Sequence, residues 1–260
     1  MGKIIIDCDP GHDDAFAIML AVRHLEVLGI TTVGGNSPLE KTTLNALKIL
    51  EALGREDIPV HAGHACPLVV PLVTAPMFHG ESGLDGPVLP QPRRGPAQGH
   101  GVDFLIDTIM AHPDLSLVAT GPLTNVAAAL GREPRIASRL KEIALMGGSA
   151  TYGNWTPTAE FNIFVDPEAA WKVFEAGVPI KMCGLNLTQQ ACVTPREFTR
   201  IAAVPTRTGK LAAELLTFFM ASSIKAAGIK GCDLHDALAV AWLIRPGLIT
   251  SAPMHVTVEL

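Results

Sequence analysis

The chain alternates short, continuous apolar runs with longer segments in which apolar residues recur at helical spacing. Continuous runs of β-branched residues are typical of strands that are buried on both faces of a parallel sheet. Such runs occupy residues 4–6, 28–33, 58–62, 115–120, 143–146 and 179–183. The segments between them predict crossover helices. The pattern therefore indicates an α/β fold with a doubly wound, mostly parallel central sheet and helices on both faces.

Helical periodicity, together with Pro and Gly residues at the ends of the segments, predicts where the helices lie. They should cover residues 13–22, 40–53, 102–112, 126–130, 167–176, 210–227 and 237–244. The stretch 63–101 is rich in Pro, Gly and His. Because long irregular loops in compact domains commonly serve binding, we expect this stretch to be a lid. A final apolar run predicts a strand over 254–260.

Composition narrows the class of protein. A chain of 260 residues with 48% hydrophobic and 17% charged residues fits a single compact domain over 1–260. The net charge of −5, without a basic stripe, argues against nucleic acid as a partner. Five scattered cysteines without a C-x-x-C pair indicate neither a disulfide framework nor a zinc cage. With no membrane span or signal peptide in the pattern, we expect a cytoplasmic protein with a small-molecule partner.

Four carboxylates interrupt the apolar pattern near the start of the chain. Asp7 and Asp9 follow the first strand, and Asp13 and Asp14 open the first helix, with Pro10-Gly11 breaking the strand between them. Carboxylates crowded at the mouth of a core repel one another, and a divalent cation or protonation relieves this repulsion. The alternative is that they serve as helix caps and first-turn acids, which leaves Asp9 unexplained.

Other polar residues also follow predicted strands, where ligands bind in open parallel sheets. They are Asn36, Thr124, Asn154, Glu160 and Asn162. Two further candidates lie elsewhere: His79 in the expected lid and Asp236 before the last helix. Amide and carboxylate groups suit a polyhydroxylated ligand. Each also has a simpler interpretation, because a loop side chain can be solvated and an acid before a helix can be its N-cap.

These segments together resemble the inosine-uridine-preferring nucleoside hydrolase family. The resemblance runs in order from Lys3 to about Val256, and the joint occurrence of its motifs is more specific than any single motif. The motifs are Asp7-Cys8-Asp9-Pro10-Gly11-His12-Asp13-Asp14, Gly34-Gly35-Asn36, His79-Gly80-Glu81-Ser82-Gly83, Gly121-Pro122-Leu123-Thr124-Asn125, Met146-Gly147-Gly148, Ala159-Glu160-Phe161-Asn162 and His235-Asp236.

The resemblance implies hydrolysis of the N-glycosidic bond of a ribonucleoside, of the inosine or uridine type, to ribose and free base, as in nucleoside salvage. It implies a Ca²⁺ ion held by Asp9, Asp14, Asp236 and the main-chain carbonyl of Thr124. An all-oxygen, carboxylate-rich set of ligands is also what Ca²⁺ prefers. Asp9 is further implied as the general base acting on a metal-bound water, and homodimers or homotetramers are implied as the assembly.

The resemblance also assigns the remaining site residues. It implies that His235 is the acid that protonates the leaving base, that Asn36 positions the water and the sugar, and that His79 lies near the base. The residues implied to hold the ribose are Asp13, Asn154, Glu160, Asn162 and Asp236.

The chain departs from the family in two places. The helix before His235 carries mostly apolar groups over 218–225 and no Tyr, and the chain ends where the family continues with further strands and a helix. These departures keep open a catalytically silent nucleoside or ribose binder. A Mg²⁺-dependent phosphatase is a third hypothesis, because D-x-D after a strand also occurs there. It would need a cationic phosphate clamp, and the motifs contain no Lys or Arg at the strand ends.

Overall fold

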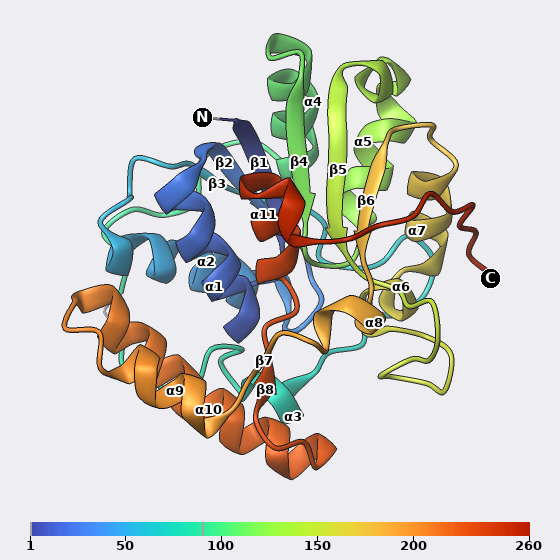
Figure 1. Cartoon of the computed structure of the whole chain (residues 1–260). Coiled ribbons are helices and arrows are strands. Elements are labelled where there is room, and N and C mark those ends of the chain that lie inside the picture. The colour runs from blue at the N-terminus through green and yellow to red at the C-terminus, as the bar shows by residue number, and fades with distance from the viewer. Residues whose placement is uncertain (1, 90) are drawn as a thin grey trace.

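A six-stranded parallel sheet forms the centre of the computed structural model, which describes residues 2–89 and 91–260 (Figure 1). The strand order is β3-β2-β1-β4-β5-β6, and every neighbouring pair is parallel. The strands are β1 (Lys3–Cys8), β2 (Glu26–Thr32), β3 (Val60–Ala62), β4 (Leu115–Ala119), β5 (Leu140–Met146) and β6 (Ile180–Cys183). This is the predicted doubly wound sheet, and the six strands predicted from the apolar runs between residues 4 and 183 are confirmed.

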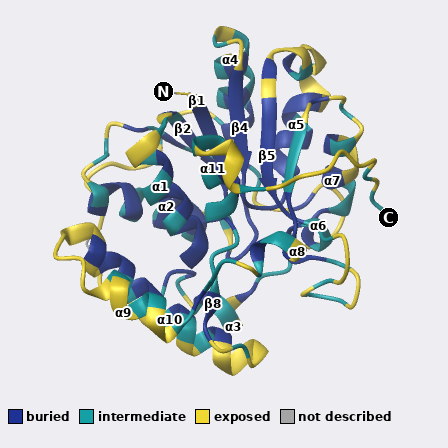
Figure 2. Ribbon diagram, in the orientation of Figure 1, coloured by how far each residue is buried: buried dark blue, intermediate teal, exposed yellow. Residues whose placement is uncertain are grey.

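The side chains of β1 explain why helices cover both faces. Ile4 and Ile6 belong to one apolar cluster, and Ile5 belongs to another, because successive residues of a strand point to opposite faces. Helices α1 (His12–His24), α2 (Leu39–Leu53) and α11 (Ala237–Ile244) pack on the first face. Helices α4 (Gly101–Ala111), α5 (Thr124–Arg132) and α7 (Pro167–Phe174) pack on the second. Figure 2 shows the central strands as the most continuously buried part of the chain.

The helices follow the expected segments, with additions. The longer ones are α1 (His12–His24), α2 (Leu39–Leu53), α4 (Gly101–Ala111), α5 (Thr124–Arg132), α7 (Pro167–Phe174), α9 (Pro195–Ala202), α10 (Arg207–Ala227) and α11 (Ala237–Ile244). Short ones are α3 (Pro76–His79), α6 (Phe161–Val165), α8 (Leu185–Thr188) and the 3₁₀ turns η1 (Pro134–Ser138) and η2 (Pro246–Leu248). No helix in the described part of the chain combines the length and apolar character needed to cross a membrane.

A small second sheet and α10 lie beyond the carboxyl ends of the central strands (Figure 1). The antiparallel pair β7 (Cys192–Val193) and β8 (Cys232–Asp233) ties the segment before α9 to the segment after α10. Helix α10 packs against α3, α9 and β8. These elements form a wall opposite the strand ends.

The predictions for the two least regular regions have different outcomes: the C-terminal strand is contradicted, and the lid stays a prediction. The predicted strand over 254–260 is wrong, because these residues have no regular structure and are mostly exposed, with only Val258 packing against the core. The predicted lid, 63–101, contains α3 and is tied to the sheet by main-chain bonds. Gly34 donates to the carbonyl of His64, and Ala75 donates to that of Asn36.

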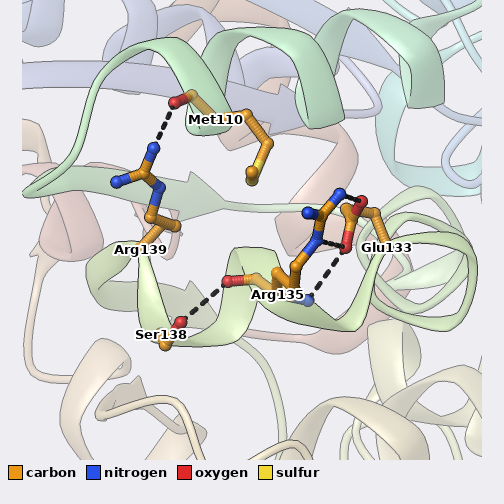
Figure 3. Close-up of polar contacts among 5 residues, drawn as sticks. All are labelled: Met110, Glu133, Arg135, Ser138 and Arg139. Atoms are coloured by element: carbon orange, nitrogen blue, oxygen red, sulfur yellow. Dashed lines mark hydrogen bonds and ion pairs between the residues drawn. The ribbon is translucent and has the colours of Figure 1, made fainter.

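The connection from α5 to β5 is stabilised by local polar contacts (Figure 3). Glu133 accepts hydrogen bonds from the main-chain N–H and the guanidinium of Arg135, at 3.2 and 2.7 Å, and so caps η1. Ser138 donates to the Arg135 carbonyl, and Arg139 donates to the carbonyl of Met110 on α4. This surface region lies away from the switch point.

The strand order places a topological switch point between β1 and β4. The chain moves outward from β1 to β3 on one side and from β4 to β6 on the other, so the loops after β1 and β4 diverge and leave a crevice. The aspartate turn follows β1, and Thr120 follows β4. The fold therefore brings polar residues far apart in sequence to one place.

Candidate active site

Three aspartates fill the turn between β1 and α1, and the structure buries all of them. Asp9 and Asp14 are fully buried, and Asp13 is 6% exposed. Gly11 is the N-cap of α1, which places Asp13 and Asp14 in the first helical turn, where the helix dipole favours negative charge. Their burial shows that they are not solvated surface acids.

Asp9 is enclosed by two glycine-containing loops. Its Oδ2 accepts the main-chain N–H of Asn36 at 2.6 Å. A Cβ atom on Gly35 would lie 2.0 Å from Oδ2, and one on Gly121 would lie 2.6 Å from Oδ1, so both positions require glycine. The buried Oδ1 has no hydrogen-bond partner in the described chain. A buried carboxylate oxygen in this state requires a proton or a cation.

Asp14 is held by donors from three elements. Its Oδ2 accepts the N–H of Gly11 at 2.9 Å and faces the Asn36 amide at 3.5 Å, while its Oδ1 accepts the Thr120 hydroxyl at 2.8 Å. The carboxylate is thus oriented from both sides of the switch point.

Asp13, Asp14 and Asp236 bring carboxylate oxygens within 4.8 Å of one another. Burial raises the pKa of each, to about 8 for Asp13, and the charge of Asp14 raises the pKa of Asp13 further. Burial and then the charge of Asp14 raise the pKa of Asp9 well above its ordinary value. Two observations fit a hard divalent cation here. The oxygens of Asp13, Asp14 and Asp236 are crowded, and the nearby Asp9, outside that group of three, has an oxygen with no partner.

Asp7 is separate from this group. It accepts the Thr31 hydroxyl at 2.5 Å and the Asn125 amide at 2.8 Å, which ties β1 to β2 and α5. Burial raises its pKa to about 7, and these two hydrogen bonds oppose the rise. These contacts are those expected of a residue that braces the turn.

A pocket of about 910 Å³, part of it open to solvent, lies over the acidic cluster. Its polar lining includes Asp13, Asn36 and Asp236. Its aromatic and apolar lining includes Phe78, Trp155, Phe161, Phe219, Ala227 and Ile229. The pocket therefore offers both oxygen ligands and flat apolar surfaces.

The loop after β5 supplies the remaining polar wall. Glu160 caps α6 and accepts main-chain N–H groups of Asn162 and Gly148, each at 3.0 Å, while burial raises its pKa. The Asn162 amide donates to the carbonyls of Thr120 and Met146. Asn154 accepts the Phe161 N–H at 2.9 Å, and all three side chains line the pocket. Capping and binding are compatible here, since each side chain keeps polar capacity that these bonds do not use.

Two histidines also line the pocket. Nδ1 of His235 lies 2.7 Å from the hydroxyl of the buried Thr188 on α8. Nδ1 of His79 lies 3.2 Å from the main-chain nitrogen of His12. Burial lowers the pKa of both rings, and the charges of His12 and His235 lower that of His79 further.

The structure brings together all but one of the predicted site residues. Thr124 is the exception. It begins α5, its hydroxyl donates to Asp166 at 2.6 Å, and its carbonyl points along a helix whose own N–H groups use it. Thr120, four residues earlier, lines the pocket and contacts Asp14 instead. Both threonines follow the same strand, so the sequence did not show which one faces the crevice.

Several pocket residues were missed by sequence reasoning. Trp155 and Gln189 line the pocket but were not selected. Phe219 also lines it, and the sequence singled out only its segment, 218–225. Thr188, which contacts His235, lies in a short helix that gave no sign of a site. For Thr120 there was a signal, because it ends a buried strand immediately before Gly121-Pro122.

Comparisons with known proteins agree with this geometry. Residues 4–260 match the family model described as inosine-uridine preferring nucleoside hydrolase. The chain is 47% identical over 260 residues to the pyrimidine-specific ribonucleoside hydrolase RihA of Shewanella oneidensis, covering 98% of this chain and 82% of that protein. The RihA protein of Photobacterium profundum is 46% identical, with coverages of 98% and 84%.

Solved structures show the same fold. A purine-preferring ribonucleoside hydrolase from Gardnerella vaginalis superposes with a TM-score of 0.94 at 34% identity, covering 99% of this chain and 84% of that one. The plant nucleoside hydrolase PpNRh1 gives a TM-score of 0.94 at 36% identity, with coverages of 99% and 83%.

Proposed function

Because the chain belongs to the inosine-uridine preferring nucleoside hydrolase family, and is thus an enzyme of a glycosidase family, we propose that it performs the calcium-dependent hydrolysis of ribonucleosides to ribose and free base. The observation that carries the proposal is the cluster of buried carboxylates at a pocket that is also lined by aromatic side chains. Carboxylates and amides suit a ribose, and aromatic surfaces suit a base.

The proposed calcium ligands are Asp9, Asp14, Asp236 and the carbonyl of Thr120, which replaces Thr124 because of its place beside Asp14. Oxygen ligands in a flexible shell favour Ca²⁺ over Zn²⁺. When bound, calcium would supply the positive charge that lowers the pKa of a nearby water and orients ribose hydroxyls. The unpartnered Asp9 oxygen and the mutual repulsion of the carboxylates support this assignment.

We assign the general base to Asp9. The Asn36 N–H orients this carboxylate through Oδ2, and the carboxylate would accept a proton from the water that attacks the anomeric carbon. Asn36 lines the pocket and so also helps to place the water and the sugar.

The ribose would be held by Asp13, Asn154, Glu160, Asn162 and Asp236. Cleavage of the N-glycosidic bond builds positive charge on the ribose, and the surrounding carboxylates stabilise that charge as it develops. The main-chain and amide contacts of Glu160 and Asn162 keep these groups in place before substrate arrives.

The departing base needs a proton, and His235 is the proposed donor. Its Nδ1 is occupied by the Thr188 hydroxyl, so the opposite edge of the ring faces the pocket. A hydroxyl both donates and accepts, so this contact suits either protonation state of the imidazole.

Pyrimidine ribonucleosides are the proposed preferred substrates. RihA proteins described as pyrimidine-specific are 46–48% identical to this chain, whereas the purine-preferring structure is 34% identical. The pocket lining includes Phe219, Ser223 and Ala227 of α10, which together give a mainly apolar surface.

Two alternatives make different predictions. A catalytically silent nucleoside binder would use the same pocket, and the mainly apolar face of α10 favours it as the second candidate. The phosphatase hypothesis has no support here, because no Lys or Arg occurs among the described residues that line the pocket.

A substrate screen tests the proposal. Purified protein with Ca²⁺ should release free base from uridine and cytidine faster than from inosine, measured by chromatography of the products. Asp9→Ala should abolish release, while Asp107→Ala, at an exposed position on α4, should leave it unchanged. Nucleoside binding without turnover would support the silent binder, and no binding would reject the proposal.

A further inference from the structure

Helix α8 holds a threonine against the proposed proton donor. The hydroxyl oxygen of Thr188 lies 2.7 Å from Nδ1 of His235. Thr188 is fully buried, and its hydroxyl makes no other hydrogen bond within residues 2–89 and 91–260. A buried hydroxyl costs stability unless it is paired, and valine would fill the same space without that cost. The imidazole is therefore the group that makes a hydroxyl useful at this position.

The main chain before Thr188 is fixed to the loop after β5. Leu185, the first residue of α8, donates to the carbonyl of Gly148 at 2.9 Å. The side chain of Asn186 accepts the N–H of Ala150 at 3.2 Å. Helix α8 is thus anchored to the same loop that carries three of the side chains proposed to hold the ribose.

The small second sheet fixes the other side of the contact. Leu234, next to His235, donates to the carbonyl of Ala191 at 3.2 Å, and β7 pairs with β8 in antiparallel register. Ala191 in turn donates to the carbonyl of Thr188 at 3.0 Å. The hydroxyl and the ring are therefore also joined through main-chain hydrogen bonds, so the two groups are held in one frame.

The contact determines which edge of the ring meets the substrate. Nε2 of His235 has no hydrogen-bond partner among the residues that the structure describes, and it is not fully buried, so it is accessible from the pocket. A half-turn of the ring about its Cβ–Cγ bond would exchange Nε2 with the carbon Cε1, which cannot deliver a proton. The Thr188 hydroxyl selects one of these two orientations, because only a nitrogen can bond to it.

The same contact suits the delivery of a proton. A ring that gives its Nε2 proton to the leaving base carries hydrogen on both nitrogens before the step and keeps the hydrogen on Nδ1 afterwards. The oxygen of Thr188 accepts this Nδ1–H in both states. In the balanced step the glycosidic bond breaks, and the base receives its electron pair together with the Nε2 proton. The attacking water gives hydroxide to the anomeric carbon and its proton to Asp9.

We propose that Thr188 is a positioning residue, which holds His235 in the orientation and tautomer from which Nε2 protonates the leaving base. The inference rests on the proposed hydrolysis and adds to it a residue outside the pocket lining, which acts through His235 and not on the substrate. It also gives α8 and the small second sheet a role, because they hold the hydroxyl and the ring together.

Removal of the hydroxyl tests this role. With uridine, Thr188→Val should lower kcat about 10- to 100-fold and change KM less than about 3-fold, because the proton is needed in the transition state. Thr188→Ala should behave in the same way, whereas Thr188→Ser should keep kcat within about 5-fold of the wild type. On p-nitrophenyl β-D-ribofuranoside, whose leaving group departs as a stable anion, all three variants should stay close to the wild type. Thr199→Val, at an exposed position on α9, is the matched control and should leave both rates unchanged.

A double-mutant cycle separates this role from a structural one. In a His235→Ala background, Thr188→Val should cause no further loss with uridine, because the ring on which the hydroxyl acts is gone. A further loss in that background, equal losses of Thr188→Val and Thr188→Ala on both substrates, or wild-type kinetics of both variants on uridine would overturn the inference. Failure of the wild type to release uracil would instead reject the hydrolysis on which the inference rests.

Discussion

At the residue scale, the site depends on positions where glycine makes room for a functional side chain. Gly11 has an ordinary extended backbone, with φ of −106°, so an added methyl group would act only through its contacts. That methyl would lie 2.6 Å from Nδ1 of His79, which is closer than packed atoms approach.

Gly11→Ala should therefore displace His79 and lower kcat/KM for uridine by about 10- to 100-fold, while the thermal midpoint falls by only a few degrees. Gly95→Ala is the matched control, because its Cβ would meet nothing within 4 Å, and it should leave both quantities unchanged. Wild-type kinetics for Gly11→Ala would show that the position of His79 is unimportant.

The buried aspartates make a second prediction, in which the sign depends on calcium. Asp236 is 3% exposed, and the charges of Asp13 and Asp14 oppose its ionisation, so its carboxylate destabilises the metal-free fold. In chelator, Asp236→Asn should raise the thermal midpoint by about 2–4 °C. In saturating Ca²⁺ the same variant should melt below the wild type, because a ligand is lost. If calcium changed the thermal midpoint of neither protein, the metal site would be contradicted.

The sequence could select site residues where chemistry left few choices, and the roles of these residues stay predictions. Carboxylates that follow a buried strand have few roles, so Asp9, Asp13 and Asp14 could be selected. Thr124 and Thr120 could not be distinguished, because the choice depends on where α5 begins. The contact of Thr188 with His235 could not be predicted, since it depends on how α8 packs against the segment after β8.

At the element scale, three neighbouring strands are joined by one carboxylate. Glu142 on β5 accepts the Ser116 hydroxyl of β4 at 3.0 Å and pairs with Lys181 of β6 at 2.8 Å. Ser116 and Glu142 are direct partners in the sheet register, so this contact is local to the ladder. Burial acts to raise the pKa of Glu142, but Lys181 and Ser116 outweigh burial and hold this pKa below its ordinary value of 4.5.

Glu142→Gln should lower the free energy of unfolding by about 1–2 kcal/mol at neutral pH, measured by urea denaturation. Because the pKa of Glu142 is lower in the folded state, its ionised form adds stability above pH 4.5, and this stability is lost as the pH falls through the folded-state pKa. The difference in unfolding free energy between the wild type and Glu142→Gln should therefore shrink in acid. Glu133→Gln, in the exposed pair with Arg135, is the control and should cost less (Figure 3). A loss for Glu142→Gln that does not change with pH would contradict the ion pair.

Elements with strong patterns were predictable, and elements made by tertiary contacts were not. Buried parallel strands leave continuous apolar runs, which is why β1 to β6 could be located. The two-residue strands β7 and β8 are too short to leave a pattern and exist because α10 brings their chains together. The apolar tail 254–260 has strand character, but no neighbouring strand pairs with it among the described residues.

At the scale of the whole molecule, strand order determines where function can lie. The order β3-β2-β1-β4-β5-β6 opens a crevice between β1 and β4, and α10 covers it from the opposite side. Residues from Asp9 to Asp236 converge there although they span most of the chain. A homodimer or homotetramer stays a prediction, which light scattering of the purified protein would measure.

The central claim is that the carboxylates at this switch point form a calcium site required for ribonucleoside hydrolysis. The most direct measurement is the rate of uracil release from uridine by metal-stripped protein as Ca²⁺ is titrated. We expect no release in excess chelator, a rate that rises to a plateau with Ca²⁺, and no recovery in Asp9→Ala. Full activity in chelator, or none at any Ca²⁺ concentration with folded wild-type protein, would contradict it.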